Sequence, residues 1–368
     1  MTIMVVRRTL AAVAYLPFYS LSFVVNLSRP SPSFVFCARM STKNSPTVAQ
    51  GEWQPLDPES LVSAPCLIEQ TLCRTSDTQA QLAKDFDYAK AVLDSWKEDE
   101  ELSWKAVWRP VIYADEHGSN LHGYCVRREP KECESDKIPG IIFFHTGAGP
   151  HDMFLLYKAV ALVNSLEGDC VVFIADILGD ESGWAWDPDR TRYNAAREKV
   201  LAVETNANRG PYRPLLQQRI QAALDYLSSK EYVDRYAAFG WCLGGHSILE
   251  ISRMIKVRSA FRALVTFHGI FDGLPTPPES NEERDDSCVD VLICHGTEDP
   301  FVSDDNIERA LATFQAHRFR TSLLQLPAKH GFTNPAQDFN DSPAFAFHAE
   351  SATKSWRQAT NLVRQKLW

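Results

Sequence analysis

The chain has 368 residues, of which 45% are hydrophobic and 23% charged, values that are ordinary for a globular protein. This length is enough for one large α/β domain with an extension. The formal net charge of −9 comes from 47 acidic and 38 basic residues, and it argues against nucleic acid as a partner.

The N-terminal segment has the composition of a targeting sequence. Residues 1–51 contain no Asp or Glu, and a mostly apolar run over 10–25 follows Arg7 and Arg8. Residues 1–39 are therefore expected to direct the chain to an organelle or the secretory pathway. The run is shorter than the about 20 residues of a membrane span, so no stable membrane anchor is expected. If translation starts at Met40 instead, a cytoplasmic protein is expected.

The next region is predicted to be an accessory extension. Residues 41–60 are polar and contain Pro, which is typical of a linker, and apolar residues recur at helical spacing over 77–102. The expected division is a linker and accessory helix over 40–103, followed by the main domain over 104–368.

The main domain opens with strands. Residues 104–113 and 121–126 are expected to form an antiparallel pair, with Gly118 in the connection. The apolar runs at 138–145 and 171–178 are typical of strands buried on both faces of a parallel sheet.

The segments after these two strands carry further signals. Gly147 and Gly149, between a strand and a helix expected over 153–166, suggest a dinucleotide site, but the third glycine of that pattern falls on Asp152. Residues 181–212 are irregular and rich in aromatics, and they are expected to form a loop or cap over a site.

The rest of the chain alternates between helices and strands. In chain order we expect a helix over 215–227, a strand ending near 241, a helix to 254, a strand over 263–269, a polar insertion through 286, a strand over 289–295, a helix over 304–316, a strand over 321–326 and a last helix starting at 342–343. This alternation predicts a mostly parallel central sheet with helices on both faces.

One strand ends in Gly-Trp-Cys-Leu-Gly-Gly at 240–245. A sharp strand-to-helix turn with a reactive side chain at its apex has this pattern, and Cys242 occupies the apex. The helix N-terminus that follows favours a thiolate. A Cys in such a turn also serves plain packing, so the assignment depends on its partners.

Two candidate partners of Cys242 directly follow later strands, at the carboxyl ends where parallel sheets have their active sites. Asp299 and His330 complete the order nucleophile, acid, histidine. His330 is expected to exchange protons with the thiol and the leaving group, and Asp299 to orient the imidazole. Asp299 also suits a turn or a helix cap, with Glu298, Asp304 or Asp305 as the acid instead. The expected oxyanion donors are the N–H groups of Leu243 and Gly147.

The nine cysteines form neither a C-x-x-C pair nor a cluster with histidine at zinc spacing. We therefore predict neither a disulfide framework nor a metal site. A thiol redox protein would need a resolving cysteine near Cys242, and none is near in the sequence.

At these residues the chain resembles the dienelactone hydrolase family. The matching motifs lie at 240–245, 267–269, 295–299 and 329–335, with Trp356 in the last helix. The resemblance covers roughly 104–368, and it implies an α/β-hydrolase fold, no metal or organic cofactor, and a Cys242-Asp299-His330 triad. The residues of a possible substrate pocket are Thr146, Trp241, His268, Phe332 and Asn334.

The chain departs from the family pattern at two positions. Thr146 stands where well-known members have a Glu that helps to activate the cysteine, and Asn334 stands where they have an Arg that grips the substrate carboxylate. The expected function is hydrolysis of a small-molecule ester, lactone or thioester through an acyl-enzyme, with dienelactone itself disfavoured. The alternative is a catalytically inactive binding or scaffold protein of the same fold. The sequence does not predict the oligomeric state.

Overall fold

The computed structural model describes residues 49–55, 94, 106–129, 137–179, 190–206, 210–231, 233–273 and 289–368. The predicted targeting segment, the accessory helix apart from Asp94, and the polar insertion lie outside these ranges. Within them, no helix is both long enough and apolar enough to cross a membrane.

A single large sheet forms the centre of the described main domain. Its strands are β1 (Ala49–Gln50), β2 (Gln54–Pro55), β3 (Ala106–Ala114), β4 (Asn120–Arg128), β5 (Ile138–Phe144), β6 (Val171–Ala175), β9 (Val233–Trp241), β10 (Phe261–Phe267), β11 (Asp290–Gly296) and β12 (Arg320–Leu326). They lie in the order β1-β3-β4-β6-β5-β9-β10-β11-β12, with β2 also pairing with β3. All pairs from β6 to β12 are parallel. The predicted, mostly parallel sheet is confirmed.

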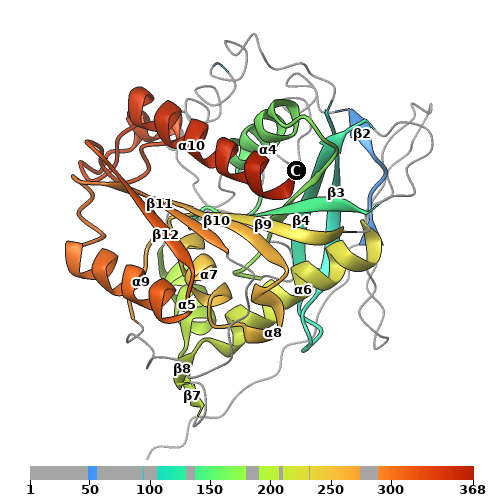
Figure 1. The fold of residues 1–368 in the computed structure, drawn as a ribbon, viewed down its shortest axis with the longest axis horizontal. Helices are drawn as coiled ribbons and strands as arrows, with labels where there is room; N and C mark the ends of the chain where they lie inside the picture. Colours follow the sequence, from blue (N-terminus) through green and yellow to red (C-terminus); the bar gives the residue numbers. More distant parts are fainter. Residues whose placement is uncertain are drawn as a thin grey trace, which may run out of the picture. The chain divides into compact units, whose positions relative to one another are not determined.

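Helices cover both faces of this sheet (Figure 1). One face carries α4 (Met153–Ser165) and α10 (Ala349–Leu367). The other carries α5 (Arg190–Leu201), α6 (Pro214–Lys230), α7 (Gly244–Ile251), α8 (Ile255–Arg258) and α9 (Asp304–Ala316). Because both faces of the sheet are covered, all five residues of the central strand β6 are apolar and buried.

Strand pleating divides the core between the two faces. Phe143 and Phe239 pack on the side of α4 and α10, whereas Phe144 and Ala238 pack on the side of α6 and α7. The Phe143 and Phe239 rings stack with their centroids 5.4 Å apart.

The structure differs from the prediction near the linker. Residues 49–55 contribute β1 and β2, which pair antiparallel with β3. The Trp53 ring lies 4.4 Å from the guanidinium carbon of Arg109 and 4.4 Å from that of Arg127, both on the strands it flanks. Cation–π contacts therefore hold this short segment on the edge of the sheet.

The segment predicted as an irregular loop or cap contains regular structure in its described part. It forms α5 and a small hairpin of β7 (Glu204–Asn206) and β8 (Gly210–Tyr212). Helix α5 buries only Tyr193 and Val200, so its sequence lacks the apolar stripe by which a helix is recognised.

The last helix begins later than predicted. It starts at Ala349, with the His348 side chain accepting a hydrogen bond from the Ser351 N–H, and not at residues 342–343. The preceding backbone instead pairs with the loop after β12: the His330 N–H donates to the Ala344 carbonyl over 3.2 Å, and the Ala346 N–H donates to the His330 carbonyl over 3.4 Å. These bonds keep the segment extended. A short 3-10 helix, η1 (Pro335–Phe339), also precedes it.

Candidate active site

Cys242 occupies a tight turn between β9 and α7. Its φ of 49° lies in the left-handed region, which non-glycine residues rarely adopt. The turn is fixed by backbone bonds: the Cys242 N–H donates to the Phe267 carbonyl over 3.2 Å, and the Cys242 carbonyl accepts from the N–H groups of Gly245 and Ile270 over 3.0 and 2.9 Å. The turn holds the sulfur at the carboxyl edge of the sheet, as predicted for an apex residue.

The close approach of α7 to β5 requires glycine at position 244. A Cβ there would lie 2.3 Å from the carbonyl oxygen of Phe144. We expect Gly244→Ala to lower the free energy of unfolding by about 1–3 kcal/mol, because the backbone must shift to admit a methyl group. Urea unfolding measures this change.

Gly118→Ala is the comparison for that measurement. Gly118 has a φ of 77°, but a Cβ there meets nothing within 4 Å, so only the backbone conformation is strained and about 1 kcal/mol is expected. A smaller loss for Gly244→Ala than for Gly118→Ala would contradict the crowding at the turn.

His330 lies between the acid and the thiol. Its Nδ1 is 2.7 Å from Oδ2 of Asp299, and its side chain also hydrogen bonds with Cys242. The other carboxylate oxygen of Asp299 accepts from the Phe301 N–H over 2.9 Å, which fixes the carboxylate at the end of β11. The structure thus brings together the three residues that the sequence places far apart.

The pKa values of Cys242 and His330 shift in opposite directions. Enclosure by the protein raises the pKa of the Cys242 thiol, but the charge of His330, its hydrogen bond and two backbone N–H groups together lower the pKa below its usual value. Burial lowers the pKa of His330, but Cys242 and Asp299 together raise it above its usual value. These directions favour a thiolate beside an imidazolium.

The two predicted oxyanion donors lie at the same sulfur. The backbone N–H groups of Leu243 and Gly147 both hydrogen bond with the Cys242 side chain. An atom bonded to Sγ would meet the same donors, so this arrangement can stabilise a negatively charged oxygen next to the sulfur.

Two of the predicted pocket residues lie beside these groups. The His268 ring centroid is 4.8 Å from that of His330, and His268 Nε2 is 3.2 Å from the Thr333 hydroxyl. Burial and the nearby His330 charge lower the pKa of His268 well below its usual value, so it stays neutral. Thr146 precedes Gly147, and its hydroxyl accepts from the Ala148 N–H over 3.1 Å.

Three other predicted pocket residues pack in the core or cap a short helix. Trp241 is fully buried, because strand alternation turns it into the core, where its ring packs 4.9 Å from that of Phe143. Phe332 is also fully buried in this core. The Asn334 side chain accepts from the Ala336 N–H over 3.0 Å and so caps η1. That these side chains line a substrate pocket stays a prediction, and the Phe332 ring centroid lies 5.5 Å from that of His268.

Sequence reasoning missed Tyr193 of α5. Its ring atoms lie 2.8–3.1 Å from where a Cβ of Gly147 would stand, and the Arg190 guanidinium carbon lies 3.9 Å from its ring centre. Burial and the charge of Cys242 raise the pKa of Tyr193 to about 12, so its hydroxyl stays protonated. The aromatic and basic composition of the predicted cap is the signal that points to this residue.

Two further aromatic rings lie beside His330. The Phe301 and Phe345 centroids lie 5.0 and 5.3 Å from that of His330, and both rings meet the imidazole edge to face. Phe301 is 46% exposed. An exposed apolar ring beside the imidazole provides a surface for an apolar part of a substrate.

Histidine, cysteine and carboxylate side chains do not gather into a metal-binding group anywhere in the described ranges. Cys125, Cys170, Cys242 and Cys294 are free thiols. Of these four, Cys125, Cys170 and Cys294 are fully buried, and burial raises the pKa of each one. Cys242 therefore differs from them in both exposure and acidity.

Comparison with known proteins agrees with this geometry. The model of the dienelactone hydrolase family matches residues 123–367. A solved structure named m3DLH is 26% identical, with a TM-score of 0.55, and the match covers 72% of this chain and 100% of that one. A dienelactone hydrolase-like promiscuous phosphotriesterase from metagenomic libraries is 25% identical, with the same TM-score and the same coverage. A comparison with curated proteins finds no match.

Proposed function

We propose that this chain, which belongs to the dienelactone hydrolase family, cleaves a small ester, lactone or thioester through a covalent bond to Cys242. Family membership makes the protein a hydrolase of esters or lactones, and it disfavours the inactive binding protein that the sequence alone leaves open. The observation that carries the finer proposal is the chain of contacts from Cys242 to His330 to Asp299.

The proposed reaction uses each group in turn. The Cys242 thiolate attacks the carbonyl carbon, and the N–H groups of Leu243 and Gly147 hold the resulting oxyanion. The imidazolium of His330 gives its proton to the leaving oxygen or sulfur as that bond breaks, which leaves a thioester on Cys242. Neutral His330 then takes a proton from water, whose oxygen attacks the thioester. The acid leaves, and the thiolate and imidazolium return.

The surroundings of the site bear on the substrate. Asn334, which caps η1, carries no positive charge with which to grip a carboxylate as the arginine of other family members does. The rings of Phe301 and Phe345 lie beside His330, the residue that protonates the leaving group in this reaction. These contacts support an ester or lactone with an apolar leaving portion in preference to dienelactone.

A substrate panel tests the proposal. The full chain is incubated with p-nitrophenyl esters of short acids, aryl and alkyl lactones, acyl thioesters and dienelactone. We also include a phosphotriester, because one structural relative is named for that activity. Hydrolysis of at least one carboxylic ester, lactone or thioester well above the buffer rate is expected. A rate equal to that of buffer across the whole panel would overturn the proposal.

A further inference from the structure

We propose that His145 is a positioning residue that aims the Gly147 N–H at the reacting centre. This inference rests on the proposed function, in which that N–H holds the oxyanion. His145 directly follows β5 and precedes the loop of Thr146 and Gly147, and its side chain is fully buried together with that of Asp176. Neither His145 nor Asp176 takes a proton in the proposed reaction.

Hydrogen bonds define the protonation of the His145 ring. The Ile177 N–H donates to Nε2 over 3.0 Å, which requires a lone pair on that nitrogen. The ring proton is therefore on Nδ1, which lies 2.6 Å from the Thr146 carbonyl oxygen and donates to it. Oδ1 of Asp176 is 3.6 Å from Nε2, too far for a hydrogen bond.

Peptide geometry then directs the Gly147 N–H. The Thr146 carbonyl and the Gly147 N–H belong to one planar peptide unit, and the described chain contains no cis peptide bond. In a trans unit these two groups point in opposite directions. Because His145 holds the carbonyl oxygen on one side, the N–H must point to the other side, where it meets the Cys242 sulfur.

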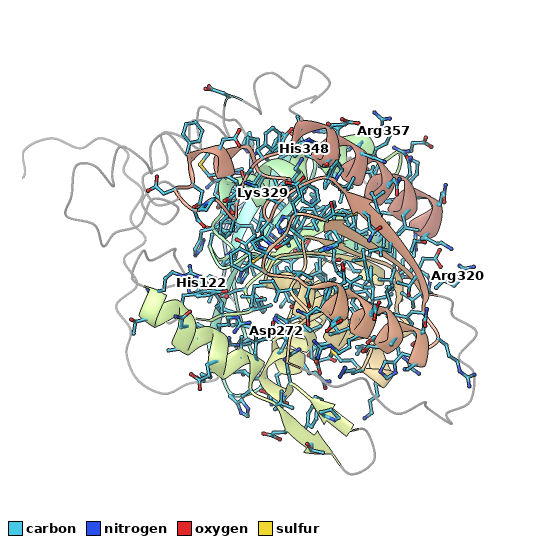
Figure 2. All side chains as sticks on the ribbon, turned by 90° about the vertical axis from the view of Figure 1, so that its left-hand side faces the viewer. His122, Asp272, Arg320, Lys329, His348 and Arg357 are labelled. Atoms are coloured by element: carbon cyan, nitrogen blue, oxygen red, sulfur yellow. The ribbon has the colours of Figure 1, made fainter. Side chains whose placement is uncertain are left out.

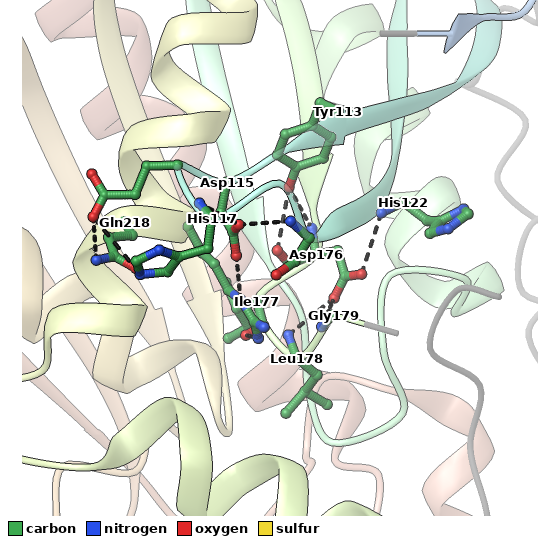
Figure 3. A network of polar contacts seen from close by, with 12 residues as sticks. Tyr113, Asp115, His117, His122, Asp176, Ile177, Leu178, Gly179 and Gln218 are labelled. Carbon is green, nitrogen blue, oxygen red and sulfur yellow. Dashed lines mark hydrogen bonds and ion pairs between the residues drawn. The ribbon is translucent and has the colours of Figure 1, made fainter. Parts of the chain in front are cut away.

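A buried network after β6 keeps the Ile177 N–H in place (Figure 3). Oδ1 of Asp176 accepts from the N–H groups of Leu178 and Gly179 over 3.0 and 2.9 Å, and Oδ2 accepts from the His122 N–H over 3.2 Å. The Tyr113 hydroxyl accepts from the Asp176 N–H over 3.0 Å. This network holds the turn that contains Ile177, and hence the His145 tautomer.

The test compares two substitutions of nearly equal shape. His145→Asn keeps an N–H donor at the position of Nδ1, whereas His145→Leu removes it. With the ester that the wild type cleaves fastest, we expect His145→Leu to lower kcat by about 10- to 100-fold with little change in KM, because a misdirected donor loses part of the 100- to 1,000-fold effect of an oxyanion donor. His145→Asn should recover most of this loss.

Alkylation of Cys242 by iodoacetamide distinguishes a positioning role of His145 from a general disruption of the site. This reaction needs the Cys242 thiolate but forms no oxyanion. Because the Gly147 N–H also helps to lower the pKa of Cys242, the rates are compared at a pH above the inflection of every profile, where the thiolate is fully formed, and there both variants should react within about 2-fold of the wild-type rate. Equal losses of hydrolysis in the two variants, or a parallel loss of alkylation, would overturn the proposal. So would unchanged hydrolysis by His145→Leu.

A crystal structure of His145→Leu provides a readout that does not depend on turnover. We expect the peptide between Thr146 and Gly147 to rotate so that its N–H no longer faces Sγ. An unrotated peptide would overturn the positioning role. Failure of the proposed function is a separate result, because it would appear as a wild type that cleaves no substrate in the panel.

Discussion

Cys242→Ala is expected to lower kcat/KM for ester hydrolysis by about 1,000-fold or more, because no other described thiol combines exposure with a lowered pKa. The α7 N-terminus and the oxyanion donors remain in this variant, so any residual rate reflects binding and electrostatic stabilisation alone. Initial rates with the best ester of the panel measure the effect.

Cys294→Ala is the matched control for this substitution. Cys294 lies on β11, two strands from Cys242 in the sheet, and it is buried with a raised pKa. The Cys294→Ala variant should hydrolyse the ester at a rate close to that of the wild type when the rates are expressed per mole of folded protein. If Cys242→Ala hydrolyses the ester as fast as Cys294→Ala, Cys242 is not the nucleophile.

His330→Ala is expected to have the second largest effect, and it should change the pH dependence of the thiol. In the wild type, His330 and two backbone N–H groups lower the pKa of Cys242 below its usual value, so the inflection of the iodoacetamide alkylation profile should lie at a lower pH than that of an ordinary thiol. Without His330, burial is left as the dominant influence on Cys242 and raises its pKa. The inflection of the alkylation profile should therefore move to higher pH, and ester hydrolysis should fall by about 1,000-fold or more.

His317→Ala is the control for this profile, because His317 lies at the end of α9 and outside the site. The alkylation profile of the His317→Ala variant should match that of the wild type. If His330→Ala left the inflection at the wild-type pH, the proposed thiolate–imidazolium pair would be wrong.

Much of the fold follows from local signals in the sequence. The apolar run of β6 predicts a strand covered on both faces, and the structure buries all of it. Helix α9 begins and ends where predicted because Ser303 caps it through the Asn306 N–H and two acidic residues occupy its first turn. In both cases the local preference and the tertiary packing agree.

Elsewhere tertiary contacts outweigh local preference. Residues 342–343 have the pattern of a helix start, yet the chain there makes only one turn, and backbone bonds between His330 and residues 344 and 346 delay the helix to Ala349. Helix α5 was missed because it buries few side chains, and with it Tyr193 was missed.

The site residues, like the fold, are predicted from the sequence only in part. Strand ends predict that Cys242, Asp299 and His330 meet, because parallel strands share an edge, and their roles in catalysis remain a proposal. The exact direction of a side chain at such an edge depends on the pleat, which turns Trp241 into the core although it directly precedes Cys242. The polar groups that hold the turn beside His145 come from β3 and from the residues after β6, and no spacing in the sequence connects them.

His246 of α7 is another buried histidine that lies close to a carboxylate. His246 is fully buried and lies 3.1 Å from Asp272, whose exposed carboxylate, labelled in Figure 2, also bonds with Arg197 of α5. Burial lowers the pKa of His246 to about 4, so it is neutral at physiological pH. His246 therefore takes no part in the proposed proton chemistry, which stays with His330.

Trapping the acyl group tests the central claim most directly. The wild type is mixed with an activated aryl ester, quenched in acid within milliseconds to seconds, and digested for mass spectrometry. We predict that the mass of the acyl group appears on the peptide that contains Cys242, grows in a burst with release of the aryl alcohol, and is absent from Cys242→Ala. Rapid hydrolysis with the acyl mass on a different residue would contradict the account.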